Sequence, residues 1–304
     1  MELAQEMVKL SRHARSYIGG ITHAHTILSN HPNHRESDLT IDRIAQTLRA
    51  ANLAGEVDSP LQYVMLNEHP SDPAKPQKLG RLSLRGRKLL RQRRRPVIGR
   101  LPIYYGLEVS LLPNGDTDLT PRLADRCPLV IASRHGLPSA TEHNPRAITK
   151  LFHQACLNPS IDVIGHPQRF IENLTGIDWP MIFQLARDSG TAIEINLNAF
   201  PRARSTPEQH DFWRRWLEAL SNSKAWVFTG TDLHNQLQLE TLVAEWHSLD
   251  SLAGRTDNHL AQYLIALSDT KFDPKLVVTS SLDQLTSWLD MSKPERARAI
   301  LKHS

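Results

Sequence analysis

Seven short apolar runs, most followed by a segment with helical spacing of apolar residues, constrain the fold of this chain more than any other feature. Strand–helix alternation favours a parallel sheet, and repeated right-handed crossovers would wind that sheet into a barrel. The sequence therefore predicts an α/β barrel with strands at residues 20–26, 63–68, 103–112, 129–133, 161–165, 192–197 and 226–229.

The predicted helices separate these strands and continue beyond the last one. Ser37 or Thr40 can cap the helix that follows the first strand, and Gly190 can end a later one. We expect a single domain over residues 1–304, with its core at about 18–240 and a helical closing segment at 241–304. The predicted helices are residues 2–17, 37–55, 144–157, 179–189, 207–221, 238–249, 258–268 and 283–302.

Residues suited to metal binding stand at or near the carboxyl ends of the predicted strands. In barrels of parallel strands, the chemistry lies at this end. If residues 20–26 form a strand, His23 and His25 point to the same face and can share a metal. The candidates at strand ends are His23, His25, His69, Glu108, His135, His166, Asp232 and His234. Eight other histidines scatter along the chain, and we interpret them as ordinary surface residues: His13, His34, His143, His153, His210, His247, His259 and His303.

Composition indicates the cellular compartment in which this protein works. Only two cysteines are present, Cys127 and Cys156, so neither a disulfide framework nor a cysteine-based zinc site is indicated, and a reducing cytoplasm fits best. The first twenty residues lack the continuous apolar core of a signal peptide. No stretch approaches the roughly 18 apolar residues of a membrane span, so we expect no membrane association.

Basic charge is concentrated between Lys75 and Arg100. This segment holds eleven of the 36 Lys and Arg residues and no Asp or Glu, which leaves 25 basic against 32 acidic residues elsewhere. Such a run is usually a solvated loop, here one whose leucines would lie on the barrel. The alternative is a surface for polyanions such as nucleic acid, since clustered Arg and Lys gain affinity by releasing phosphate counterions.

Six short motifs, in this order along the chain, resemble the PHP family, the polymerase and histidinol phosphatase domains. The resemblance covers residues 18 to about 240 and implies a distorted seven-stranded (β/α)7 barrel, here with extra C-terminal helices, and a cluster of two or three divalent metals. The motifs are His-Ala-His-Thr at 23–26, Asn-Glu-His at 67–69, Gly-Leu-Glu at 106–108, Ser-Arg-His at 133–135, Gly-His-Pro at 165–167 and Gly-Thr-Asp-Leu-His at 230–234.

The resemblance also implies a distribution of ligands over three metals. Glu108 would bridge two of them, and Glu108, Asp232 and His234 are the residues expected to take part in catalysis. The first metal would be held by His23, His25, Glu108 and Asp232, the second by Glu108, His135 and His166, and the third by His31, His69 and His234.

Two positions depart from the family pattern, and one ligand has a rival. Ile21 and Glu68 stand where the family usually has Asp. Loss of the first acid could loosen a contact that orients an imidazole. His34 could replace His31 in the third metal site.

Mixed imidazole and carboxylate ligands suit zinc, manganese or iron. Two metals about 3.5 to 4 Å apart would lower the pKa of a bridging water towards about 7, and they would neutralise phosphate oxygens. Arg134, Arg169 and Arg202 or Arg204 lie just beyond strand ends and could bind the substrate phosphate. Glu194 and Asn196 share one face of a predicted strand, and whether they face the site is left open.

The sequence thus predicts a metal-dependent phosphoesterase that hydrolyses a small phosphorylated metabolite or nucleotide by metal-activated hydroxide in a trinuclear site. One alternative is a phosphoesterase acting on nucleic-acid ends. An amidohydrolase is a weaker reading, because no strand end offers the bridging lysine that such enzymes use. A third alternative is a non-catalytic, metal-stabilised barrel that binds polyanions through residues 75–100. The sequence does not give the oligomeric state.

Overall fold

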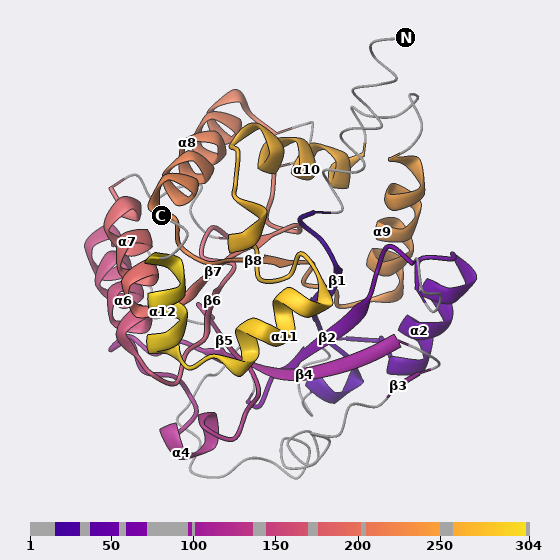
Figure 1. Ribbon diagram of the computed structural model, residues 1–304, viewed down its shortest axis with the longest axis horizontal. Coiled ribbons are helices and arrows are strands. Elements are labelled where there is room, and N and C mark those ends of the chain that lie inside the picture. The colour runs from indigo at the N-terminus through magenta and orange to yellow at the C-terminus, as the bar shows by residue number, and fades with distance from the viewer. Residues whose placement is uncertain are drawn as a thin grey trace.

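The computed structural model (Figure 1) contains the predicted barrel. It describes residues 16–30, 37–54, 59–71, 97–98, 101–135, 144–169, 176–201, 205–249 and 258–301. Parallel strands follow in the order β1 (Gly20–Ala24), β2 (Tyr63–Glu68), β4 (Leu101–Ser110), β5 (Val130–Ser133), β6 (Val163–Gly165), β7 (Ala192–Asn196) and β8 (Val227–Gly230), and the short β3 (Val97–Ile98) pairs antiparallel with β4.

The barrel is nearly closed between its first and last strands. Backbone hydrogen bonds join the segment after β8 to β1, from Thr231 N to Thr22 O at 2.9 Å and from His25 N to Leu233 O at 2.8 Å. The second of these bonds, with one from Leu233 N to His23 O at 3.2 Å, forms a parallel bridge between Ala24 and Leu233. The seam therefore brings the carboxyl ends of β1 and β8 together.

Helices surround the strands, as the apolar spacing predicts. Thr40 rather than Ser37 caps α2, Asn144 caps α6, and Gly190 ends α7 with φ 74°. The helices are α2 (Ile41–Ala50), α4 (Pro121–Ala124), α6 (Pro145–Leu157), α7 (Trp179–Ser189), α8 (Pro207–Ser223), α9 (Gln236–Ser248), α10 (His259–Asp269), α11 (Leu282–Asp290) and α12 (Lys293–Leu301), with 3-10 turns at Ile27–Ser29 and Pro274–Leu276.

Strand alternation produces two apolar layers. Outward-facing residues such as Val64, Leu66 and Ile164 join the large core between strands and helices. Inward-facing residues such as Met65, Ile131 and Phe228 fill the barrel, together with Leu285 and Trp288 of α11, which lies across the centre of the view in Figure 1. The interior is thus packed at the amino end of the strands, and polar side chains occupy its carboxyl end.

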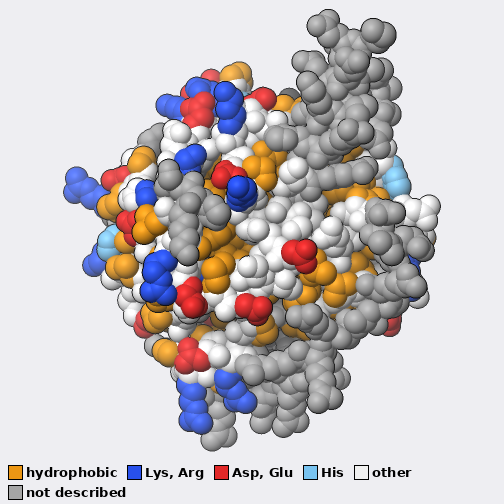
Figure 2. Space-filling view, in the orientation of Figure 1, with side chains coloured by type: hydrophobic (Ala, Val, Ile, Leu, Met, Phe, Trp, Pro, Cys, Tyr) orange, Lys and Arg blue, Asp and Glu red, His pale blue; other side chains and the backbone are white. Residues whose placement is uncertain are grey.

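Acidic and basic side chains are interspersed over the face drawn in Figure 2. Within the described residues, no helix is long and apolar enough to cross a membrane.

Three sequence expectations need correction. The predicted first strand, 20–26, ends at Ala24, because the register shifts between Ile21 and Ala24 and His23 has φ 54°. The pattern at 283–302 is two helices, since the chain turns at Met291 and α12 begins beside Pro294. His259 is buried and its Nε2 lies 2.8 Å from Leu197 O, so it is not a surface histidine.

Several predictions fall on residues outside the described ranges. They are most of the helix at 2–17, nearly all of the basic segment at 75–100, and His13, His31, His34, His143, His303, Arg202 and Arg204.

Candidate metal centre

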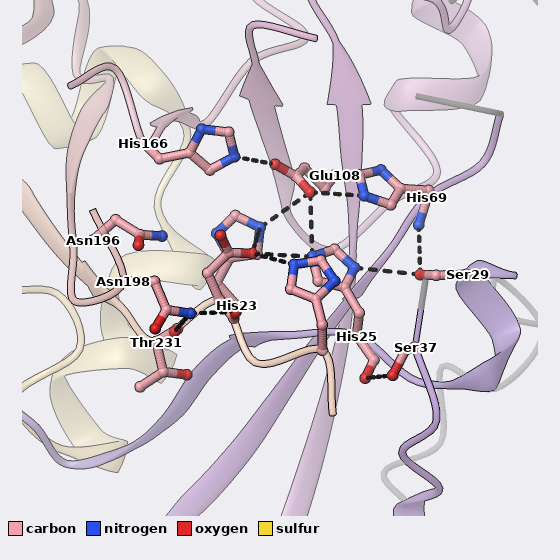
Figure 3. A network of polar contacts seen from close by, with 12 residues as sticks. His23, His25, Ser29, Ser37, His69, Glu108, His166, Asn196, Asn198 and Thr231 are labelled. Carbon is pink, nitrogen blue, oxygen red and sulfur yellow. Dashed lines mark hydrogen bonds and ion pairs between the residues drawn. The ribbon is translucent and has the colours of Figure 1, made fainter. Parts of the chain in front are cut away.

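Glu108 lies at the centre of a buried histidine cluster at the carboxyl end of the barrel (Figure 3). Its Oε2 is 3.2 Å from Nε2 of both His23 and His25, and 3.1 Å from Nε2 of His69. Its Oε1 is 2.8 Å from His166 Nε2 and 3.5 Å from His135 Nε2. One carboxylate from β4 therefore faces imidazoles from the ends of four other strands.

Asp232 lies beside this cluster at the end of β8. Its Oδ1 is 2.9 Å from His234 Nε2, 3.5 Å from His25 Nε2 and 3.8 Å from His23 Nε2. Its Oδ2 is 3.6 Å from Arg169 Nη1. The structure thus gathers eight of the nine predicted ligands at one place, and the ninth, His31, is outside the described residues.

Backbone strain accompanies three of these residues. His23, His166 and Asp232 have φ of 54°, 25° and 50°, in a region that residues other than glycine rarely adopt. His23 and His25 both reach the cluster because of this local turn, and not through the regular alternation that the sequence analysis assumed. Asn198 Nδ2 donates to Thr231 O at 2.9 Å and to Asp232 O at 2.7 Å, which supports the turn at Asp232.

The donor set fits divalent cations. His23 Nε2 and His25 Nε2 are buried without a hydrogen bond in the described part of the chain, and they point toward Glu108 and Asp232. Imidazole and carboxylate donors are the ligands of zinc and related ions. Three groups have their donor atoms within 4.8 Å of one another: His23, His25 and Asp232; His23, Glu108 and His166; and His25, His69 and Glu108.

These groups share members and differ in part from the predicted sets. His69 lies against His25 and Glu108, whereas the resemblance implied that it joins His31 and His234. His135 and His234 are at the margin, with side chains 12 % and 18 % exposed. Which ligand holds which metal, and how many metals bind, stays a prediction.

Charge and burial oppose each other in the metal-free cluster. Burial lowers the pKa of His23 and His25, but the neighbouring carboxylates outweigh it, so the pKa of His23 lies well above its usual value and that of His25 is about 9. For His69 burial prevails and the pKa lies well below its usual value. Burial also lowers the pKa of His135, to about 4. For Glu108 burial favours the neutral acid, yet the surrounding imidazoles hold its pKa well below the usual value.

Glu68 does not stand among the donors. It accepts hydrogen bonds from Thr26 Oγ1 at 2.6 Å and Ser29 Oγ at 2.5 Å. Ser29 Oγ in turn lies 3.3 Å from His25 Nδ1 and accepts from His69 N at 3.0 Å. Glu68 thus braces the turn after β1, a role that sequence reasoning missed because it depends on the path of residues 25–30.

Glu194, whose orientation the sequence left open, faces the site. Its side chain is fully buried, and its Oε1 lies 2.6 Å from His23 Nδ1. Asn196 is buried beside it, with Nδ2 at 3.4 Å from Oε1. The period-two alternation of β7 was the signal that both side chains share one face.

The predicted phosphate-binding arginines have different environments. Arg169 follows His166, is 46 % exposed and reaches Asp232. Arg134 lies between Ser133 and His135 and is buried. Arg202 is outside the described residues, so only the first two can be placed at this end of the barrel.

Sequence comparison finds a polymerase with exonuclease activity and probable phosphatases similar to this chain. No protein-family model matches it. It is 30 % identical over 143 residues to the DNA polymerase/3'-5' exonuclease PolX of Bacillus subtilis (strain 168), a match that covers 46 % of this chain and 23 % of that protein. It is 28 % identical over 192 residues to a probable phosphatase of Thermoanaerobacter sp. (strain X514), covering 63 % of this chain and 69 % of that one.

A solved structure shares the fold. The histidinol phosphate phosphatase of Lactococcus lactis subsp. lactis Il1403, complexed with zinc, L-histidinol and phosphate, has a TM-score of 0.52 and 15 % sequence identity, over 84 % of this chain and 95 % of that one. The barrel is of the PHP type. The relatives, a polymerase and probable phosphatases, confirm the PHP resemblance that six motifs indicate. They also support the assignment of this chain to the phosphatases, which are hydrolases.

Proposed function

We propose that this PHP-type barrel hydrolyses phosphomonoesters with divalent cations bound among the clustered histidines, and that its substrate is a small phosphorylated metabolite or a nucleotide. The observation that carries the proposal is Glu108, whose two oxygens face five imidazoles at the carboxyl end of the barrel. A carboxylate in this position is suited to bridge two cations. Three overlapping donor groups, two of which include Glu108, support a site for two or three ions.

Divalent cations bound here would act as Lewis acids toward the phosphate and would lower the pKa of a water molecule towards about 7. The zinc of the structurally similar phosphatase supports zinc for this chain, and manganese and iron suit the same ligands. His23, His25, Glu108 and Asp232 would hold the first ion, and His166 and His135 would join Glu108 at the second.

The protein's own part is to bind the phosphate and exclude water from the buried donors. Arg169 suits phosphate binding, because its guanidinium is half-exposed at the edge of the site and 3.6 Å from Asp232 Oδ2. A planar guanidinium can hold two phosphate oxygens at once. His234, the most exposed of the described imidazoles in the cluster, lies on the same edge beside Asp232.

Two substrate classes are supported by named relatives. The structurally similar enzyme favours a small phosphomonoester such as histidinol phosphate. The match to PolX, a polymerase with exonuclease activity, favours a nucleic-acid end as the second candidate. Binding of polyanions through residues 75–100 without catalysis stays a third prediction, and that segment lies almost entirely outside the described residues.

The test is a substrate panel with the metal-loaded protein: p-nitrophenyl phosphate, histidinol phosphate, nucleoside monophosphates and single-stranded DNA. We expect release of phosphate from at least one monoester, abolished by a chelator and by His25→Ala or Asp232→Ala. The matched control is His247→Ala, which removes an exposed imidazole on α9 and should leave the rate unchanged. If the metal-loaded protein hydrolyses no phosphoester in the panel, the proposed function is wrong.

A further inference from the structure

We infer that Glu194 is a positioning residue that fixes two candidate ligands, His23 and His166, in the geometry needed to bind a cation. This inference rests on the proposed metal site. Glu194 comes from β7, whereas His23 lies in β1 and His166 follows β6, the neighbour of β7, so one side chain would act on ligands from two other strands.

The contacts of Glu194 define its role. Oε1 lies 2.6 Å from His23 Nδ1, and Oε2 accepts a hydrogen bond from the backbone N of His166. A carboxylate only accepts hydrogen bonds, so His23 must carry its proton on Nδ1 when it is neutral. This leaves the lone pair on Nε2, the atom that faces Glu108 and Asp232. Carboxylate–histidine pairs of this kind fix the ring orientation of metal-bound histidines.

Both histidines that Glu194 contacts are conformationally strained. His23 has φ 54° and His166 has φ 25°, and such conformations persist only where the surroundings hold them. The hydrogen bond to His166 N acts on the backbone of that turn, and the contact with His23 acts on its ring. Removing the carboxylate should therefore release both ligands at once.

Gly230 gives a second, independent indication. It pairs with Asn196 across β7 and β8, and a Cβ atom at Gly230 would overlap Oε1 of Glu194. The site therefore has room for the Glu194 carboxylate only while position 230 lacks a side chain. The same arrangement recurs at this level of the barrel, where a Cβ at Gly106 would overlap Asn67 and one at Gly165 would overlap Ser133.

The sharpest variant is Glu194→Gln. Its amide has one accepting oxygen, while two N–H donors, His23 Nδ1–H and His166 N–H, need an acceptor, so one donor must face the amide NH2 group. We expect zinc affinity to fall about 10- to 100-fold, as for other partners of metal-bound histidines. Gly230→Ala should lower zinc affinity in the same direction, because the added methyl displaces the Glu194 carboxylate.

The experiment measures zinc affinity of the metal-free full chain by competition with a chromophoric chelator, without substrate. The matched control is Asp162→Asn, which alters a carboxylate at the amino end of β6 that accepts from Val130 N and Arg296 Nη1. It should lower the unfolding temperature yet leave zinc affinity unchanged. If Glu194→Gln does not fold, the test uses Gly230→Ala: zinc should raise the unfolding temperature of this variant less than that of the wild type.

The outcomes separate this inference from the proposed function. The positioning role would be overturned if the zinc affinity of Glu194→Gln lay within about twofold of the wild-type value. The same criterion applies to Gly230→Ala if that variant is the one measured. An equal loss in Asp162→Asn would also overturn it, because general destabilisation would then explain the effect. If the wild-type chain itself bound no zinc, manganese or iron, the proposed function would be wrong, and the positioning role would be wrong with it. Loss of zinc affinity in the variants of an otherwise inactive protein would support the role of Glu194 while contradicting phosphatase activity.

Discussion

Glu108 is buried among five imidazoles, and these imidazoles stabilise its negative charge. Burial alone would favour the neutral acid, but the histidines hold its pKa well below the usual value. Glu108→Gln keeps the size of the side chain and removes the charge that two of the three candidate donor groups share. We expect the hydrolytic rate to fall by more than about 100-fold, because this residue would be a direct ligand. Metal content and rate measured together check this, and a variant with normal values of both would contradict a bridging role.

His25 leads to a prediction about protons. Its pKa in the metal-free protein is about 9, because Asp232 and Glu108 outweigh the effect of burial. At pH 7 the ring is therefore protonated, and a cation must displace that proton. Zinc binding should release protons at pH 7, and zinc affinity should rise with pH until about 9, at most tenfold per pH unit for each proton. Calorimetry in two buffers with different ionisation enthalpies checks this, and equal binding heats in both would contradict it.

The same raised pKa bears on the stability of the metal-free protein. A group whose pKa rises on folding contributes stability that is present in full below its unfolded pKa, near 6.5 for histidine, and is lost as the pH rises through the folded value. The contribution of His25 should therefore decline between about pH 6.5 and pH 9.

Most of the candidate site could be predicted residue by residue, because its ligands stand at strand ends in the sequence. Glu68 and His259 could not. Glu68 accepts hydrogen bonds from Thr26 and Ser29, and His259 is buried against Leu197 O. Both sets of contacts depend on how distant segments of the chain meet. Glu194 was left open because alternation gives the face of a strand but not what stands opposite it.

At the level of helices and strands, prediction succeeded where local signals mark both ends. The bounds of β2 and α7 agree with the sequence, and α7 has Asp178 as its N-cap, Pro180 in its first turn and Gly190 after its last residue. The first strand was predicted too long because its end is set by the turn at His23, which serves the site and has no local sequence signal.

Two helix ends provide a matched pair of substitutions. Gly190 after α7 and Lys224 after α8 both adopt the left-handed conformation, with φ of 74° and 60°. Gly190→Ala should destabilise the fold by at least about 1–2 kcal/mol, because a Cβ there is strained and would also overlap Lys293 O. Lys224→Gly should stabilise it by up to about 1 kcal/mol, since glycine adopts this conformation freely. Urea unfolding of both variants checks the pair, and changes of the same sign would contradict the explanation.

For the whole molecule, the C-terminal helices close the end of the barrel opposite the histidines. Arg296 of α12 is buried, lies 3.6 Å over the ring of Trp288, and donates to Asp162 Oδ1 at 2.6 Å. Lys293 Nζ donates to Cys156 O and Asn158 O at the end of α6. These contacts hold α12 against the amino end of β6 and the end of α6.

Removing this closure should destabilise the fold without altering the site. Arg296→Met leaves Asp162 without its ion pair, and the loss of one partner of a buried pair costs about 3 kcal/mol. Zinc affinity should stay at the wild-type value, because Asp162 and His166 lie before and after β6, at its two ends. Thermal unfolding and a zinc titration of the same preparation check this, and a fall in zinc affinity would show that the two ends are coupled.

The barrel as a whole was predictable because strand–helix alternation is a property of the full sequence. Its near-closure was predicted from handedness, and the seam between β1 and β8 agrees with it. The distribution of the ligands over individual metals stays a prediction. In the structure His25, His69 and Glu108 form one donor group, which the order of the motifs alone did not imply.

The most direct test of a metal-dependent phosphatase is a titration. The chain is freed of metal with a chelator, and phosphate release from p-nitrophenyl phosphate is measured as zinc or manganese is added in known molar ratios. We expect no hydrolysis without metal and a rate that rises and levels off at two or three equivalents. A rate that is unaffected by metal removal, or the absence of hydrolysis at every ratio, would contradict it.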